Sequence, residues 1–85
     1  MKYKIVFTKQ AEKDLKKVAT SNLKNKVFHL LSILENEPLQ PPFEKLIDCG
    51  ETYSRRINIQ HRLVYQIFEE EKTIKIIRMW THYRD

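Results

Sequence analysis

Residues 53–65, with the sequence YSRRINIQHRLVY, constrain the fold more than any other segment because they place arginines on both sides of a short turn. If residues 58–60 form the three-residue loop of a β-hairpin, Arg56 lies directly opposite Arg62 on one face. Like charges in opposed positions repel, and one cross-strand pair is worth about 0.2–1 kcal/mol. Two opposed guanidinium groups therefore indicate that an anion binds between them, because arginine suits bidentate contact with phosphate. A solvated strand face, with both arginines turned to water, is the alternative interpretation.

Hydrophobic spacing in the first half of the chain predicts one strand followed by two helices. Residues 2–7 alternate as a strand with one buried face does. Thr8 is a candidate N-cap for a short amphipathic helix that ends near Thr20. Ser21 is a candidate N-cap for the second helix, which Pro38 and the prolines after it bring to an end.

Three strands are predicted in the second half of the chain, over residues 51–57, 61–68 and 73–81. They form an antiparallel meander that the first strand joins, so the predicted fold class is α+β with a two-helix hairpin and one sheet. A turn centred between residues 70 and 71 sets Arg62 beside Met79. His82 then lies just past the end of the same hairpin, at the edge of the sheet that carries the arginines.

Composition indicates one globular domain, residues 1–85, with a basic surface. Of the 85 residues 41% are hydrophobic, which is enough for a single modest core. The formal net charge of +5 favours a polyanionic or acidic partner, with nucleic acid as the first candidate, although charge alone says nothing about catalysis. Cys49 is the single cysteine, so no intramolecular disulfide can form, and the N-terminus lacks the apolar run of a signal peptide or membrane span. We therefore expect a cytoplasmic protein that does not associate with membranes.

Three segments resemble the Txe/YoeB family of bacterial toxins, within the wider RelE/ParE group: YSRRINIQHRLVY, the upstream PFEKL at residues 42–46, and the late pair His82-Tyr83. The resemblance extends, in length and element order, over essentially the whole chain. It implies a RelE-like microbial RNase fold and the toxin component of a type II toxin–antitoxin system. The implied activity is ribosome-dependent cleavage of mRNA in the A site, which inhibits translation. The implied partners are a cognate acidic antitoxin of the YefM/Axe kind and the 70S ribosome with mRNA, and a homodimer is one possible assembly.

Cleavage of RNA through its own 2′-hydroxyl needs a base for that hydroxyl, an acid for the departing 5′-oxygen and fixed cations for the charge of the phosphorane. The family resemblance implies that Glu44 is the general base, His82 the general acid and Arg62 the phosphate stabiliser. The hairpin geometry adds Arg56 as a second cation. This chemistry requires no metal ion or other cofactor.

Two further residues near the end of the chain are candidate substrate contacts. Tyr83 can stack on an unpaired base or steady the scissile phosphate, since stacking on an aromatic ring is worth about 1–3 kcal/mol per base. Members of the family commonly end at the His-Tyr pair, whereas Arg84 and Asp85 follow it here, and Arg84 is a candidate phosphate contact. An exposed imidazole at His82 and a solvated carboxylate at Glu44 are the simpler interpretations of those residues.

Two other functions fit the same sequence. A ParE-like toxin that binds gyrase shares the scaffold but blocks a protein, so it does not need Glu44 and His82 around a phosphate. A basic RNA-binding module needs the arginines but not the proton-transfer groups. The His82-Tyr83 ending argues against the gyrase-binding function, and single substitutions separate all three.

Overall fold

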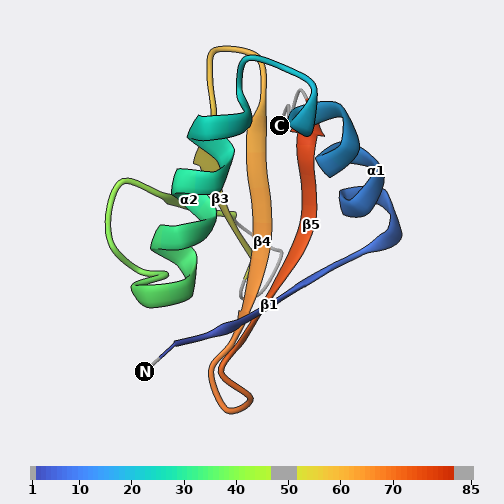
Figure 1. The fold of residues 1–85 in the computed structure, drawn as a ribbon. Helices are drawn as coiled ribbons and strands as arrows, with labels where there is room; N and C mark the ends of the chain where they lie inside the picture. Colours follow the sequence, from blue (N-terminus) through green and yellow to red (C-terminus); the bar gives the residue numbers. More distant parts are fainter. Residues whose placement is uncertain (1, 47–51, 82–85) are drawn as a thin grey trace.

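A mixed five-stranded sheet carries two helices on one face (Figure 1). The structure is a computed structural model, and it describes residues 2–46 and 52–81. The elements, in chain order, are β1 (Lys4–Phe7), α1 (Lys9–Ala19), α2 (Lys24–Asn36), β2 (Glu44–Lys45), β3 (Thr52–Arg56), β4 (Arg62–Phe68) and β5 (Thr73–Thr81). The predicted α+β class, with its order of strand, two helices and strands, is confirmed.

The strands lie in the order β1-β5-β4-β3-β2. Strands β3, β4 and β5 form the predicted antiparallel meander, and β1 joins the same sheet in parallel with β5. Strand β2 pairs antiparallel with β3 at the opposite edge, where Glu44 lies opposite Ser54. This short strand was not predicted, because two residues carry no periodicity from which a strand can be recognised.

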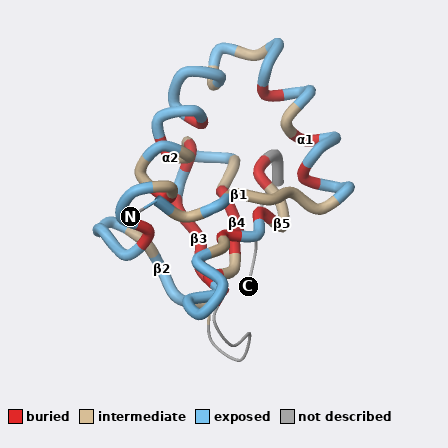
Figure 2. The backbone as a smooth tube through the Cα atoms, turned by 60° about the horizontal axis from the view of Figure 1, so that its bottom comes forward, coloured by how far each residue is buried: buried red, intermediate tan, exposed pale blue. Residues whose placement is uncertain are grey.

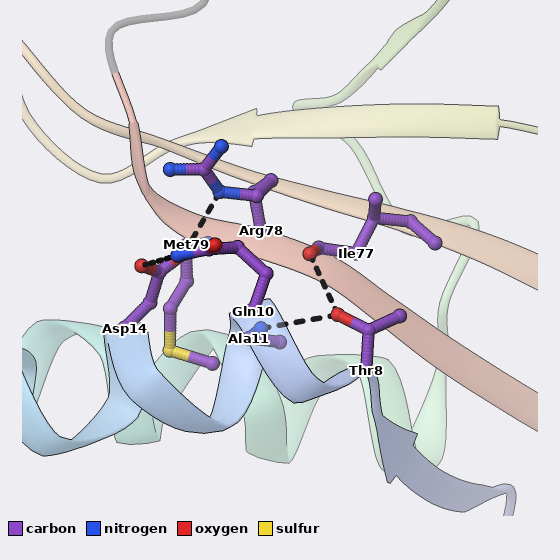
Figure 3. Close-up of polar contacts among 7 residues, drawn as sticks. All are labelled: Thr8, Gln10, Ala11, Asp14, Ile77, Arg78 and Met79. Carbon is purple, nitrogen blue, oxygen red and sulfur yellow. Dashed lines mark hydrogen bonds and ion pairs between the residues drawn. The ribbon is translucent and has the colours of Figure 1, made fainter.

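Helix α1 begins and ends where its sequence predicts. The Thr8 hydroxyl accepts a hydrogen bond from the backbone N–H of Ala11 at 3.0 Å, which is the expected N-cap contact. The same hydroxyl donates to the carbonyl of Ile77 on β5 at 2.9 Å, so the cap also ties the helix to the sheet (Figure 3). The helix ends before Thr20.

The predicted N-cap of α2 is wrong. The Ser21 hydroxyl accepts a hydrogen bond from the backbone N–H of Leu23 at 3.1 Å and donates to the carbonyl of Val18 at 2.9 Å. These contacts close the turn between the helices, but α2 begins only at Lys24, and Leu23 at the cap position makes no side-chain cap contact. Ser21 therefore ends one helix and shapes the connection; it does not begin the next helix.

The hydrophobic core lies between the helices and one face of the sheet (Figure 2). It includes Ala11 and Val18 from α1, Val27, Leu30 and Leu34 from α2, and Leu63, Tyr65, Ile67, Ile74, Ile76 and Met79 from β4 and β5. The helix residues confirm the hydrophobic spacing from which the two helices are predicted, and on β4 every second residue from Leu63 to Ile67 lies in the core. Full burial of one large aliphatic side chain contributes about 1.5–3 kcal/mol. Neither described helix has the length and apolarity needed to span a membrane.

The β3–β4 hairpin has the predicted register, with Arg56 directly opposite Arg62. Its turn is closed by Asn58, whose side-chain oxygen accepts hydrogen bonds from the backbone N–H groups of Gln60 at 2.8 Å and His61 at 2.7 Å. An asparagine that bonds the backbone ahead of it in this way stabilises a tight turn. The opposed arginines inferred from the sequence are therefore a feature of the fold.

The predicted alignment of β4 with β5 is wrong at its far end. Near the turn the two strands pair as expected, but register shifts on either side of Val64 interrupt the ladder. Arg62 consequently pairs with Thr81, and the predicted pairing with Met79 does not occur. The residue that precedes His82 in the sequence thus reaches the position opposite Arg62.

A buried carboxylate accompanies this irregularity (Figure 3). Asp14 on α1 is fully buried, and its Oδ2 accepts hydrogen bonds from the backbone N–H of Met79 and from the Nε of Arg78, both at 3.1 Å. Gln10, one turn earlier on the helix, donates to the other carboxylate oxygen at 3.1 Å. The Met79 N–H therefore bonds to the helix, which fits the irregular pairing of β5 with β4 at this point.

Candidate functional site

The structure brings Glu44 and Arg62 into contact from two strands that do not pair with each other. Strand β2 sets Glu44 opposite Ser54 on β3, and Arg62 reaches across from β4. Its Nη1 donates to a carboxylate oxygen of Glu44 and, at 3.4 Å, to the hydroxyl of Ser54. Two of the three residues with implied catalytic roles therefore share one site.

Solvent reaches the two members of this ion pair unequally. The Glu44 side chain is 65% exposed, whereas the Arg62 side chain is 25% exposed. A pair with one largely exposed partner is worth little to stability, typically about 0–1 kcal/mol. The contact is thus weak enough to be exchanged for another anion at small cost.

Glu44 also changes the interpretation of the opposed arginines. Arg56, exposed on β3, stands opposite Arg62 as expected, and the anion in contact with Arg62 is the carboxylate of the protein itself. A phosphate that binds Arg62 in a bidentate manner would compete with this carboxylate.

A cavity of about 370 Å³ opens beside these residues. Lys26 and His29 of α2 are among the residues that line it, as are Glu44, Arg56 and Arg62. The volume falls within the range of ligand-binding clefts, about 300–1,000 Å³. Its lining includes cationic residues from both α2 and the β3–β4 hairpin, which suits an anionic ligand.

Arg55 is a functional candidate that was not predicted from the sequence. Its side chain is buried, with 2% exposure, beneath the same cavity. It donates from Nε to the Tyr65 hydroxyl at 3.1 Å, from Nη1 to the Pro42 carbonyl at 3.0 Å and from Nη2 to the Pro38 carbonyl at 2.9 Å. The signal was present in the hairpin register, which places Arg55 opposite Leu63 and therefore on the core face.

Burial around Arg55 also affects Tyr65. Removal from water raises the pKa of the Tyr65 hydroxyl, and the nearby Arg55 charge opposes that rise only in part. The ring of Tyr65 stacks on Tyr53, with centroids 5.9 Å apart, and Tyr53 in turn meets Phe43 edge-on at 5.6 Å. The segment before β2 therefore rests on a row of aromatic rings and one buried guanidinium.

Comparison with known proteins defines the family. The sequence model of one protein family, described as the ParE toxin of the type II toxin–antitoxin system parDE, matches residues 5–85 of this chain. The YoeB structure solved as a dimer from Staphylococcus aureus is 34% identical, with a TM-score of 0.82 over 98% of this chain and 100% of that one. This chain belongs to the RelE/ParE superfamily of type II toxins, as a YoeB/Txe-type member. The resemblance noted in the sequence is thereby confirmed.

Other solved toxins support the same assignment. A YoeB/ParE toxin from Agrobacterium tumefaciens is 25% identical, with a TM-score of 0.85 over 94% of this toxin and 99% of that chain. YoeB in complex with YefM from Staphylococcus aureus is 35% identical, with a TM-score of 0.78 over 98% of this toxin and 100% of that chain. Relatives of this toxin are thus known with an antitoxin and as a dimer. No curated protein sequence matches the toxin.

Three predicted site residues, His82, Tyr83 and Arg84, lie outside the described part of the toxin. Their roles stay predictions. Among the described residues no group of three or more His, Cys, Asp or Glu side chains could hold a metal ion. Of the predicted site residues that the structure describes, Glu44 contacts Arg62, and Arg56 lies opposite Arg62.

Proposed function

We propose that this toxin is an endoribonuclease that cleaves mRNA in the ribosomal A site without a metal ion. The observation that carries the proposal is the contact between Glu44 and Arg62, because it puts a carboxylate and a half-buried cation at one point of an otherwise basic surface. A base beside a phosphate-binding cation is the minimum that attack by a neighbouring hydroxyl needs. The family membership established above is consistent with this chemistry.

The reaction is an internal transesterification. Glu44 takes the proton from the 2′-hydroxyl, whose oxygen attacks the adjacent phosphorus as the bond to the 5′-oxygen breaks. Arg62 and Arg56 offset the charge that develops on the phosphorane oxygens. His82 gives a proton to the departing 5′-oxygen. The products are a 2′,3′-cyclic phosphate and a 5′-hydroxyl.

The ion pair gives substrate binding a defined first step. In the free toxin the Glu44 carboxylate is bound to the Arg62 guanidinium, and an incoming RNA phosphate displaces the carboxylate from it. Glu44 is then released from its contact with Arg62 and available to the 2′-hydroxyl of the bound nucleotide. Ribosome-bound message is held in place before it meets the toxin, which supplies orientation that would otherwise cost entropy. Isolated RNA is accordingly expected to be a poor substrate.

The proposal is tested by mapping cleavage of a defined message on purified ribosomes. Glu44→Gln keeps an oxygen that can bond to Arg62 but removes the base, and we expect cleavage to fall by about 10²–10⁴-fold. Glu70→Gln, which makes the same change in the exposed β4–β5 turn, is the matched control and should cleave as the wild type does. Efficient cutting of a message with a 2′-deoxy target, or a product with a 5′-phosphate, would contradict the mechanism.

We further propose that an acidic antitoxin silences the toxin by covering the cationic residues that line the cavity. Support comes from Lys26, Arg56 and Arg62, which are part of this lining, and from the complex of the related YoeB with YefM. The product of a neighbouring gene for a small acidic protein should be titrated against the toxin while cleavage is measured. A complex that cleaves with undiminished rate would contradict this role.

The family description favours one alternative, a ParE-like toxin that binds gyrase. Such a toxin has no use for a proton acceptor at Glu44. Glu44→Gln and His82→Ala variants that still arrest growth, and arrest that is relieved by resistant gyrase, would establish the alternative. Loss of arrest in both variants, with the fold intact, would favour the nuclease.

A further inference from the structure

The Arg55 side chain donates hydrogen bonds to the loop that leads to Glu44, a contact that cannot be seen in the sequence motif. Its guanidinium is buried, and a buried charge is costly unless it is hydrogen-bonded. No carboxylate within residues 2–46 and 52–81 forms an ion pair with it; its three nitrogens donate to the Tyr65 hydroxyl and to the carbonyls of Pro38 and Pro42. The charge is therefore satisfied mainly by the backbone of one loop.

This loop has few other means of holding its shape. Residues 39–42 are exposed, and the prolines at 38, 41 and 42 have no N–H to give to a backbone hydrogen bond. Inside the loop, Gln40 donates to the carbonyl of Glu37 at 3.0 Å. The two carbonyls held by Arg55 lie at the start and near the end of the segment, so one side chain fixes both ends.

The far end of the loop runs directly into the site. Pro42 is followed by Phe43, whose ring lies 5.6 Å from the Cζ of Arg55, and then by Glu44 on an edge strand of two residues. That strand is short and exposed, so its own pairing gives it little rigidity. The position of Glu44 opposite Ser54 therefore depends on what holds residues 42 and 43.

We propose that Arg55 is a positioning residue for Glu44, which holds the Pro38–Pro42 loop and so keeps the carboxylate in reach of Arg62. The inference rests on the proposed nuclease function for its kinetic consequence, but its structural content is independent of that function. Arginine is needed because its planar fork reaches two carbonyls and a hydroxyl at once. Lysine carries the same charge but presents a single ammonium group on a flexible stem.

The test compares three variants of the full toxin by hydrogen exchange and by single-turnover cleavage of ribosome-bound message. Arg55→Lys removes the fork. Tyr65→Phe removes the acceptor of Nε but leaves both loop carbonyls bound. Ile74→Val deletes one buried methyl group at the start of β5, the end of the strand next to the β4–β5 turn, and controls for a general loss of stability.

In Arg55→Lys we expect the amide of Leu46, which bonds to the Thr52 carbonyl at 2.9 Å, to exchange at least about tenfold faster, while β4 amides are unchanged. The maximal cleavage rate should fall by about 10–100-fold with little change in KM, since a misplaced group costs rate more than binding. Tyr65→Phe and Ile74→Val should stay within about threefold of the wild type in both measurements.

Unchanged exchange at Leu46 in Arg55→Lys would overturn the proposal, as would a cleavage rate equal to that of Ile74→Val. If Arg55→Lys does not fold, Arg55→Met, which buries an apolar chain without a charge, serves in its place. If the wild type cleaves nothing, the nuclease proposal fails, and the exchange comparison still decides whether Arg55 holds the loop.

Discussion

Two buried charges, Asp14 and Arg55, connect irregular backbone to the rest of the toxin, but in different ways. Asp14 holds β5 at the point where its pairing shifts, and it has a countercharge in Arg78 (Figure 3). Arg55 holds a loop and is satisfied by neutral oxygens. Loss of Asp14 leaves the backbone N–H of Met79 in the core without its acceptor, whereas loss of Arg55 leaves the carbonyls of Pro38 and Pro42 in the loop without a donor. Asp14 thus supports mainly the fold, and Arg55 mainly the placement of the site.

The largest effect is expected where neither buried charge acts, at the reacting groups themselves. Arg62→Ala and His82→Ala should abolish growth arrest because each removes a group needed as charge develops, and one general acid or base is worth about 10²–10⁴-fold. The unfolding curve of Arg62→Ala should match that of the wild type within about 1 kcal/mol, since an ion pair with a largely exposed partner carries little stability. Full toxicity of a folded His82→Ala protein would contradict its role as the acid.

The Asp14 side of the comparison is tested by stability. Asp14→Ala should lower the free energy of unfolding by about 2–4 kcal/mol, because it leaves the Met79 N–H without its acceptor and removes a charge-assisted bond to Arg78. Asp14→Asn, which keeps one acceptor oxygen, should lose less. Urea titration followed by circular dichroism measures both. A stability loss in Asp14→Ala no larger than that of Arg55→Lys would show that Asp14 does not support the fold more than Arg55 does.

The burial of the Tyr65 hydroxyl, which accepts a hydrogen bond from Arg55, is tested by the stability of the toxin at high pH. Burial raises the pKa of Tyr65, so its protonated form favours the folded state. The stability from this group is fully present below the tyrosine pKa of the unfolded chain, about 10, and is lost as pH rises through the higher folded value. Melting temperatures between pH 8 and 11 should therefore fall less steeply for Tyr65→Phe than for the wild type. Parallel curves would show that the hydroxyl is not shielded as described.

The smallest effect is expected far from both charges, where β1 meets the β4–β5 turn. The Tyr3 hydroxyl donates to Glu69 at 2.5 Å, and this bond, with the nearby Lys72, lowers the pKa of Glu69. The contribution is present above the glutamate pKa of the unfolded chain and is lost as pH falls through the lower folded value. Glu69→Gln should melt slightly below the wild type at pH 7 and at the same temperature near pH 3. Glu70→Gln, next to it in the turn, is the control and should show no difference at either pH.

Much of the toxin could be predicted because its signals are local. The Thr8 cap, the apolar stripes of both helices and the alternation of β4 follow from spacing within single elements. The opposition of Arg56 and Arg62 follows from a three-residue loop that Asn58 closes through its own side chain. Each of these features is decided by residues a few positions apart, so the sequence displays it directly.

Other features depend on contacts between distant residues. The contact of Glu44 with Arg62 depends on the two-residue strand β2, which forms by pairing with β3. A strand this short has no periodicity from which the sequence could predict it. Arg55 and Arg56 are identical neighbours in the sequence, yet the pleat sends one into the core and leaves the other exposed.

The order of the elements, the hairpin that opposes two arginines and the family of the toxin can all be inferred from the sequence. Tertiary contacts, in contrast, set which arginine meets Glu44, which one holds its loop, and where β5 ends relative to Arg62. The reason is that a buried donor bonds to whichever acceptor the fold brings close to it, and that acceptor can be far away in the sequence. For the Met79 N–H that acceptor is Asp14, 65 residues earlier in the chain, and for the Arg55 guanidinium it is a loop that begins 17 residues before it.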